Sequence, residues 1–118
     1  MPTKEELIAL CLQLPGAYED YPFDEGEWCC MRHSGNRRIF AMLFERQGRI
    51  WINVKNEPMW GDFWRQTYSA VIPAYHCNKL HWSSIIVDGS MSVEEILRLI
   101  QDSFDLTSPM KKHRVMAP

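Results

Sequence analysis

The sequence predicts an α+β domain, a two-layer sandwich in which helices pack on one face of an antiparallel sheet, in the order α-β(3)-α-β(2)-α. Apolar residues recur at helical spacing near both ends of the chain. Apolar and polar residues alternate over residues 49–55, and short glycine-containing turns flank this segment, as in β-hairpins. The 118 residues suffice for one hydrophobic core.

The two terminal helices have clear start signals. Residues 3–14 begin with Thr3, and residues 92–106 begin with Ser92; each is followed three positions later by a glutamate, which is the pattern of a capping box. Apolar residues then recur every three or four positions in both segments. The first helix is expected to end before Pro15 and Gly16.

A third helix is predicted over residues 57–68. Asn56 is a candidate cap, and a proline in the first turn needs no hydrogen-bond partner there. Gly61 is a weak position in this helix, because glycine costs about 1 kcal/mol relative to alanine. The expected buried stripe consists of Trp60, Phe63, Trp64 and Tyr68.

Five segments have strand character, and a loop is expected before the first of them, over residues 16–27. In residues 49–55 three apolar side chains take one face, while Trp51 shares the other with polar residues. The segment 37–44 is apolar on both faces, which is typical of a central strand. The predicted strands are residues 27–33, 37–44, 49–55, 69–76 and 81–87.

Charge is unevenly distributed along a chain whose net charge is only −2. Residues 28–82 contain eight basic and three acidic residues, and residues 109–118 contain three basic and no acidic residues. We therefore predict one domain over residues 1–108, followed by a basic tail over 109–118. The acidic total argues against tight, unspecific DNA binding.

Several classes of protein are not favoured. The sequence has no apolar run of about 18 residues, so no membrane span is expected. The N-terminal segment lacks the pattern of a secretory signal, and we expect a cytoplasmic protein. The four cysteines form no CxxC pair, and Cys29 and Cys30 are expected to point to opposite faces of a strand. We expect four free thiols, no metal and no cofactor.

The segment AYHCNKLHWSS, residues 74–84, concentrates the residue types of functional sites. His76, Cys77 and His81 have metal-binding atoms, but a structural zinc commonly needs four ligands. A site around His76, Lys79 and His81 would suit an enzyme, although no nucleophile signature surrounds Cys77. The favoured interpretation is a structural corner.

This structural corner has three expected features. Asn78 is suited to a turn, because its side chain can bond to nearby backbone groups. Trp82 is expected to be buried. Lys79 is expected to pair with Glu19 or Asp20.

Several stretches resemble the MmcQ/YjbR-like family: LPGAYEDYPF, VIPAYHCNKLHWSS, VDGSMSVEEI and DSFDL, with KKHR near the end. Together they cover nearly the whole chain. The resemblance implies the order of elements given above, and a fold similar to CyaY and to type III secretion chaperones. It also implies DNA binding through wing-like hairpins. The matching motif residues are Pro15, Gly16, Asp20, Pro22, Phe23, His76, Asn78, Lys79, His81 and Trp82.

A DNA-binding role would use basic residues on two predicted hairpins and in the tail. Exposed arginines beside turns are good phosphate ligands, and an exposed Trp51 would stack on a base. The alternative is that Trp51 is packed in the protein and the arginines are only solvated. The candidate residues are Arg37, Arg38, Arg46, Arg49, Trp51, Lys55, Lys111, Lys112 and Arg114, with the four hairpin arginines expected on one side of the sheet edge.

The sequence therefore favours a small, non-enzymatic binding module with DNA as its nominal partner. A protein-interaction or chaperone-like module is the alternative, and an enzyme is the third hypothesis. No catalytic residue is assigned, and a monomer is expected rather than a dimer.

Overall fold

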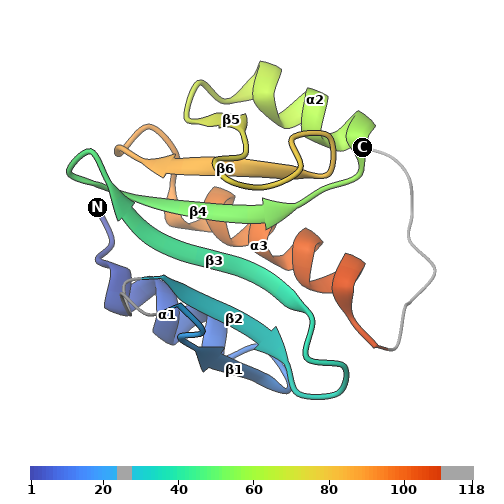
Figure 1. Cartoon of the computed structure of the whole chain (residues 1–118). Helices are drawn as coiled ribbons and strands as arrows, with labels where there is room; N and C mark the ends of the chain where they lie inside the picture. The colour runs from blue at the N-terminus through green and yellow to red at the C-terminus, as the bar shows by residue number, and fades with distance from the viewer. Residues whose placement is uncertain (24–27, 110–118) are drawn as a thin grey trace.

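The computed structural model describes residues 1–23 and 28–109. Within these residues it has three helices and six strands, and the strands form one sheet in the order β1-β2-β3-β4-β6-β5 (Figure 1). All neighbouring strands are antiparallel, so the predicted α+β class is confirmed. The elements are α1 (Lys4–Leu12), β1 (Ala17–Asp20), β2 (Cys29–His33), β3 (Ile39–Arg46), β4 (Arg49–Lys55), α2 (Pro58–Thr67), β5 (Val71–Pro73), β6 (Trp82–Val87) and α3 (Val93–Thr107).

Helices α1 and α3 begin as the sequence predicts. The Thr3 hydroxyl accepts a hydrogen bond from the backbone N–H of Glu6, and Ser92 and Glu95 form the same capping box. Both helices lie behind the sheet in Figure 1. The Ser103 hydroxyl of α3 donates to a β3 carbonyl and accepts from the backbone N–H of a β4 residue, which fixes α3 across these two strands.

One hydrophobic core lies between the helices and the sheet. Alternate residues of the central strands point into it, because successive side chains of a strand face opposite sides. Helix α2 contributes Trp64 to the same core. The largest fully buried side chains of this core include Leu7, Met31, Phe40, Leu43, Ile52, Ile85, Ile96 and Ile100.

Strand β1 is absent from the sequence prediction, which assigned residues 16–27 to a loop. That assignment is wrong for residues 17–20, which pair with β2. The strand lies at the sheet edge and its residues are exposed or only half-buried, so it lacks the apolar alternation that marks a buried strand. Gly16, with φ of 73°, makes the turn from α1 into β1. The observed order is therefore α-β(4)-α-β(2)-α.

The predicted strand over residues 69–76 is also shorter than expected. Only Val71–Pro73 pair with β6, and residues 74–81 leave the sheet as a loop. Pro73 has no N–H for a ladder hydrogen bond, which favours a strand end at this edge position. We refer to residues 74–81 as the motif loop.

Helix α2 starts one residue later than expected. Glu57, not Asn56, occupies the N-cap position, and its side chain makes no capping bond. Asn56 is instead buried beneath the helix, where its amide donates to the backbone oxygens of Glu57 and Leu80 and its carbonyl accepts from Ser83. A side chain at Gly61 would overlap this amide, which explains a glycine inside a helix. Phe63 is exposed, contrary to the expected stripe.

None of the helices within residues 1–23 and 28–109 is both long and apolar enough to cross a membrane.

Candidate functional site

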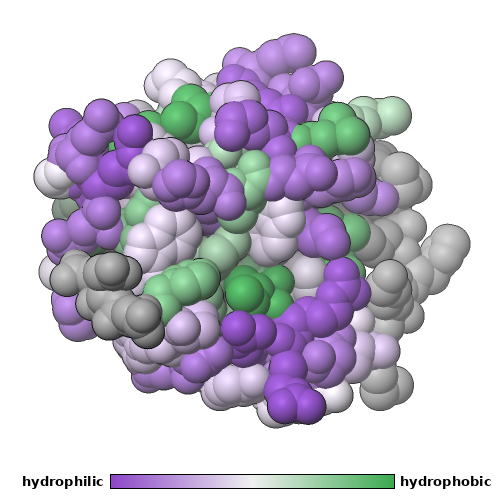
Figure 2. Space-filling view, viewed as in Figure 1, coloured by the Kyte–Doolittle hydropathy of each residue, from purple (hydrophilic) through white to green (hydrophobic). Residues whose placement is uncertain are grey.

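The sheet face turned away from α1 and α3 holds a cluster of aromatic rings. We call this the aromatic face and define it by Trp28, Phe44, Trp51, Tyr75 and His76. The rings of Trp28 and Phe44 stack in parallel with centroids 3.8 Å apart, and Phe44 lies 6.1 Å from Trp51 on the neighbouring strand. Figure 2 shows pale and green surface in the centre of this side, bounded by hydrophilic residues.

Two partners from the motif loop complete this cluster. Tyr75 lies 5.9 Å from both Phe44 and Trp51, and the His76 ring lies 4.0 Å from that of Tyr75. Tyr75 and Trp28 are half-buried, whereas His76 is exposed. The accessible part of the face is therefore formed by rings from two segments that are distant in sequence.

Arg46, the last residue of β3, is held between two of these rings. Its guanidinium carbon lies 4.8 Å from the centre of the Trp51 ring and 4.2 Å from that of Tyr75, within the range of cation–π attraction. The Trp51 indole N–H donates to the Arg46 carbonyl at 3.0 Å, which fixes the backbone as well. A positive charge is thus positioned beside the rings.

Two fully buried polar side chains attach the motif loop to the sheet. The Asn53 amide donates to the Tyr75 carbonyl at 2.8 Å and to the Cys77 sulfur at 3.4 Å. The Ser84 hydroxyl donates to the Asn53 carbonyl and accepts from the Tyr75 N–H at 2.9 Å. Both side chains have no exposed surface. Because buried polar groups need partners, this network sets the position of the loop.

The turn of the motif loop is organised by Asn78, as the sequence predicts. Its side-chain oxygen accepts from the N–H groups of Leu80 and His81, and its backbone oxygen accepts from that of Trp82. His76, by contrast, has a φ of 61°, which is unfavourable for a residue with a Cβ atom. An exposed and strained residue beside a ring cluster is a feature of binding sites.

Two parts of the predicted structural corner differ from the structure. Trp82 is half-buried at the start of β6, not fully buried. Lys79 does not pair with the acidic motif, because Asp20 forms an ion pair with Arg32 at 2.8 Å and Glu19 accepts from the Tyr21 hydroxyl. Asp20 lies on β1, at the opposite edge of the sheet from β5, where the motif loop begins.

The family-motif residues near the N-terminus lie in the turn before β1 and in the segment that follows it. Pro15 and Gly16 lie between α1 and β1. Pro22 is exposed, and the Phe23 ring packs edge-on against Trp28 with centroids 6.0 Å apart. Phe23 is 49% exposed, so it extends the accessible rim of the aromatic face.

The predicted arrangement of basic hairpins is wrong. Arg37 and Arg38 lie before β3, whereas Arg46 and Arg49 face each other across the turn after it, so the two pairs lie at opposite ends of this strand. Lys55 is at the end of β4 away from Arg49. The remaining candidates, Lys111, Lys112 and Arg114, lie outside the described residues.

The condition for base stacking at Trp51 is not met. Its side chain is only 5% exposed, because the motif loop and Arg46 cover it. Sequence reasoning placed Arg46 among the candidates but missed Trp28, Phe44 and Tyr75. Of these three, only Phe44 had a local signal, because it lies in the segment 37–44 that neighbours the Trp51 segment 49–55.

The cysteines are free, as predicted. Cys30 and Cys77 lie on the same side of the sheet as the aromatic face. Burial raises the pKa of the Cys30 thiol to about 11. Burial also raises the pKa of Cys77, although its bond from Asn53 opposes this effect. No group of three or more metal-binding side chains gathers in residues 1–23 or 28–109.

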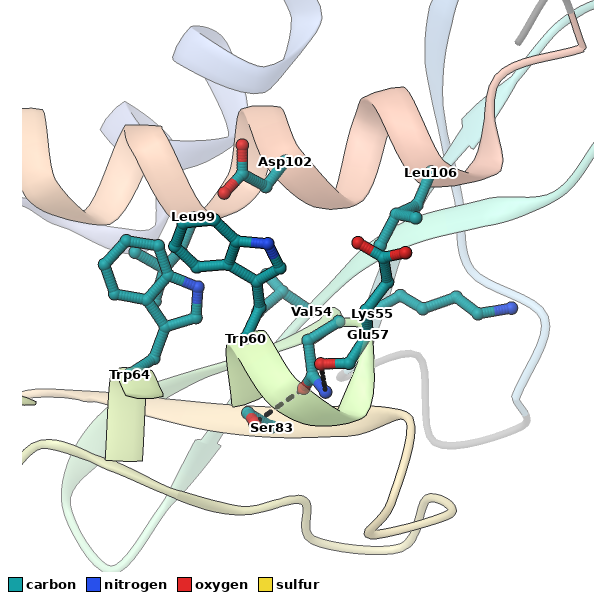
Figure 3. Close-up of a pocket in the computed structure, with 10 residues that line it drawn as sticks. Val54, Lys55, Glu57, Trp60, Trp64, Ser83, Leu99, Asp102 and Leu106 are labelled. Atoms are coloured by element: carbon teal, nitrogen blue, oxygen red, sulfur yellow. Dashed lines mark hydrogen bonds between the residues drawn. The ribbon is translucent and has the colours of Figure 1, made fainter. Parts of the chain in front are cut away.

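A small cavity lies on the helical side, between α2 and α3 (Figure 3). Trp60 and Trp64 stack with centroids 5.3 Å apart and face Leu99 and Asp102 of α3. One oxygen of Glu57 is buried there without a hydrogen-bond partner in the described chain. The cavity measures about 10 Å³, which is room for about one water molecule. It suits a hydrated helix junction and is too small for a ligand.

The comparisons with known proteins identify the class to which this fold and motif belong. The YjbR family model matches residues 12–106. The chain is thus a member of the YjbR family. It is 31% identical to YjbR of Escherichia coli K12 over 102 residues, covering 86% of this chain and 84% of the relative. It is 29% identical to YyaQ of Bacillus subtilis over 118 residues, covering 91% and 99%.

Solved structures agree with the fold. A crystal structure of a Pseudomonas syringae protein superposes with a TM-score of 0.80 at 26% identity, covering 90% of this chain and 99% of that one. A Deinococcus radiodurans protein gives a TM-score of 0.82 at 27% identity, covering 97% and 84%. YjbR and YyaQ are described as uncharacterized proteins, so the family defines the fold and leaves the ligand to be argued from the site. The likeness to CyaY and to secretion chaperones stays a prediction.

Proposed function

We propose that this YjbR-family chain is a non-enzymatic binding module whose partner is another protein, bound on the aromatic face. The observation that carries the proposal is the accessible group of Trp28, Tyr75 and Arg46, extended by the exposed ring of Phe23. Tryptophan, tyrosine and arginine are the residues that dominate the energy of protein interfaces. Their clustering on one rigid sheet supports recognition.

The chemistry of the face favours binding over catalysis. Cys77 is the most exposed thiol, and its raised pKa makes it a poor nucleophile at neutral pH. Asn53 and Ser84, which could otherwise orient a substrate, are engaged in holding the motif loop. We also propose that the module is monomeric before it meets its partner, which size-exclusion chromatography would check.

The proposed function is tested by capture and crosslinking with matched variants. Trp28→Ala and Tyr75→Ala remove accessible rings from the aromatic face, whereas Phe63→Ala removes a ring that is 44% exposed on α2. A specific partner should be recovered with the wild type and with Phe63→Ala. It should be lost with the two face variants, provided that circular dichroism shows them folded. Equal recovery with all four proteins contradicts the proposal.

DNA is the second candidate partner, supported by Arg46 and Arg49, which lie at one turn beside the rings. Stacking rings next to basic groups suit an unpaired strand better than a duplex held between two wings. The double change Arg46→Ala/Arg49→Ala is compared with Arg37→Ala/Arg38→Ala, which removes the same charge at the other end of β3. If DNA is the partner, only the first change should weaken the binding of a labelled single strand. It should also lower the slope of log affinity against log salt by up to about two units.

A further inference from the structure

Arg46 has an environment that none of the other described arginines shares. The two ion pairs among the described residues join Asp20 to Arg32 and Asp62 to Arg65. Arg46 instead lies in the angle between two aromatic rings, with its guanidinium carbon 4.8 Å from the centre of Trp51 and 4.2 Å from that of Tyr75. Neither ion pair of the described residues involves Arg46, so its guanidinium N–H groups have no carboxylate partner there, and such groups match a carboxylate in a two-pronged hydrogen bond.

This environment also lowers the entropic cost of binding. A free arginine loses much side-chain freedom when it forms an ion pair, but stacking against Trp51 and Tyr75 has already restricted Arg46. Preorganised groups bind with less loss of freedom. Half-burial of Arg46 also reduces the screening that weakens fully exposed ion pairs.

An aromatic surface adjoins this charge. Trp28 stacks on Phe44, and the Tyr75 and His76 rings each lie 6.4 Å from Trp28. Ring pairs interact favourably at centroid separations of about 4.5–7 Å, so an added aromatic group beside Trp28 would be within reach of both loop rings. His76, whose φ is 61°, is exposed, so one of these rings lies at the surface.

We infer that Arg46 and Trp28 form a recognition site for an aromatic group that carries or adjoins a carboxylate, such as an acidic residue next to an aromatic residue in a partner segment. Arg46 binds the carboxylate and Trp28 contacts the ring. This inference rests on the proposed function, because it specifies the chemistry of the partner that the aromatic face takes.

The test uses small probes and the five tryptophan indole N–H signals in nitrogen-15 NMR spectra of the full chain. Indole-3-acetate supplies both a ring and a carboxylate. Indole-3-acetamide keeps the ring without the charge, and tryptamine reverses the charge. Saturable shifts of the Trp28 and Trp51 signals are expected with indole-3-acetate, while the signals of Trp60 and Trp64, which belong to α2, remain unshifted. The amide and the amine should bind at least about tenfold more weakly, because each lacks the charge-assisted pair with arginine.

Two variants separate the role of Arg46 from general charge. Arg46→Gln keeps a planar group between the rings and removes the charge, and it should lower indole-3-acetate affinity about tenfold. Arg49→Gln removes the same charge across the same turn and should change affinity less than twofold. Unchanged Trp60 and Trp64 signals establish that each variant is folded.

Three results would overturn the inference: equal binding of all three indoles, equal effects of the two variants, or tighter binding of thymidine 5′-phosphate than of indole-3-acetate. The last result would favour the nucleic-acid alternative. The proposed function fails separately. If Trp28→Ala abolishes partner capture although the indoles show no charge preference, the face binds protein through other chemistry. If the probes behave as expected and capture is unaffected, the site exists but does not hold the partner.

Discussion

Replacing Gly61 by alanine gives a sharp test of how α2 is seated, because the sequence and the structure predict opposite signs. Helix propensity alone favours alanine by about 1 kcal/mol. In the structure, the added Cβ atom would overlap the Asn56 amide nitrogen and lie 2.8 Å from its carbon. Asn56 is buried and its side chain is hydrogen-bonded to Glu57, Leu80 and Ser83, so any movement away from the added atom would disturb these bonds. We therefore expect Gly61→Ala to lower the free energy of unfolding.

The magnitude follows from the bonds that Asn56 makes. Its side chain takes part in three hydrogen bonds, to Glu57, Leu80 and Ser83, and each contributes about 0.5–1.5 kcal/mol. Loss or distortion of these bonds, less the gain in propensity, gives a net destabilisation of roughly 1–3 kcal/mol. Urea unfolding followed by far-ultraviolet circular dichroism measures this difference with an unchanged m-value.

The same change in an Asn56→Ala background tests the cause. Without the amide the remaining close neighbour is the end of the flexible Arg65 side chain at 3.0 Å, which can shift, so alanine at position 61 should stabilise the helix by up to about 1 kcal/mol. The effect of Gly61→Ala should thus change sign between the two backgrounds, which is a coupling that only residues in contact produce. A stabilising Gly61→Ala in the wild type, or an equal effect in both backgrounds, would refute the role assigned to Asn56.

Three further predictions concern stability. Burial lowers the pKa of His33; the charge of Arg38 lowers it further, whereas the backbone of Phe104 and the charge of Asp105 raise it. The protein should therefore lose stability as pH falls from about 6.5 toward the lowered pKa, by up to about 1.4 kcal/mol per pH unit. His33→Gln should remove this slope in urea titrations. Trp51→Ala should cost about 3–5 kcal/mol, because the ring is buried and not a free base-stacking surface; a change below about 1 kcal/mol would contradict this. A chelator should leave the thermal unfolding transition unchanged, and a lowered transition temperature would show that a metal contributes. After unfolding, a thiol reagent should count four free cysteines.

The elements that the sequence predicted well are those with local signals. Both capping boxes involve residues three positions apart, and the alternation in β4 repeats every two residues. Asn78 was recognised because its turn chemistry is confined to the next few residues. In each case the side chains that cause the structure lie within one turn or one strand of it.

The errors have the opposite origin. Residues 17–20 form a strand only because β2 supplies an edge for pairing. Asn53 and Trp51 occupy the polar-looking face of β4, yet both are buried, because the motif loop more than twenty residues later folds over them. An alternating pattern reveals two faces of a strand but not what covers the second one.

The contact between the motif loop and β4 also explains why the structure supports an aromatic face and does not support basic wings. Four arginines near two turns look equivalent in the sequence, but β3 separates them into two pairs. Only Arg46 meets rings from the motif loop, and it does so because Asn53 and Ser84 hold Tyr75 over the sheet. The left-handed backbone of His76 costs free energy, and the hydrogen bonds of the buried Asn53 and Ser84 side chains hold the loop in place despite this cost. In this chain the motif loop places the Tyr75 ring beside Arg46. If the aromatic face binds a partner as proposed, a change that frees the loop should weaken that binding even when Arg46 and Trp28 are intact.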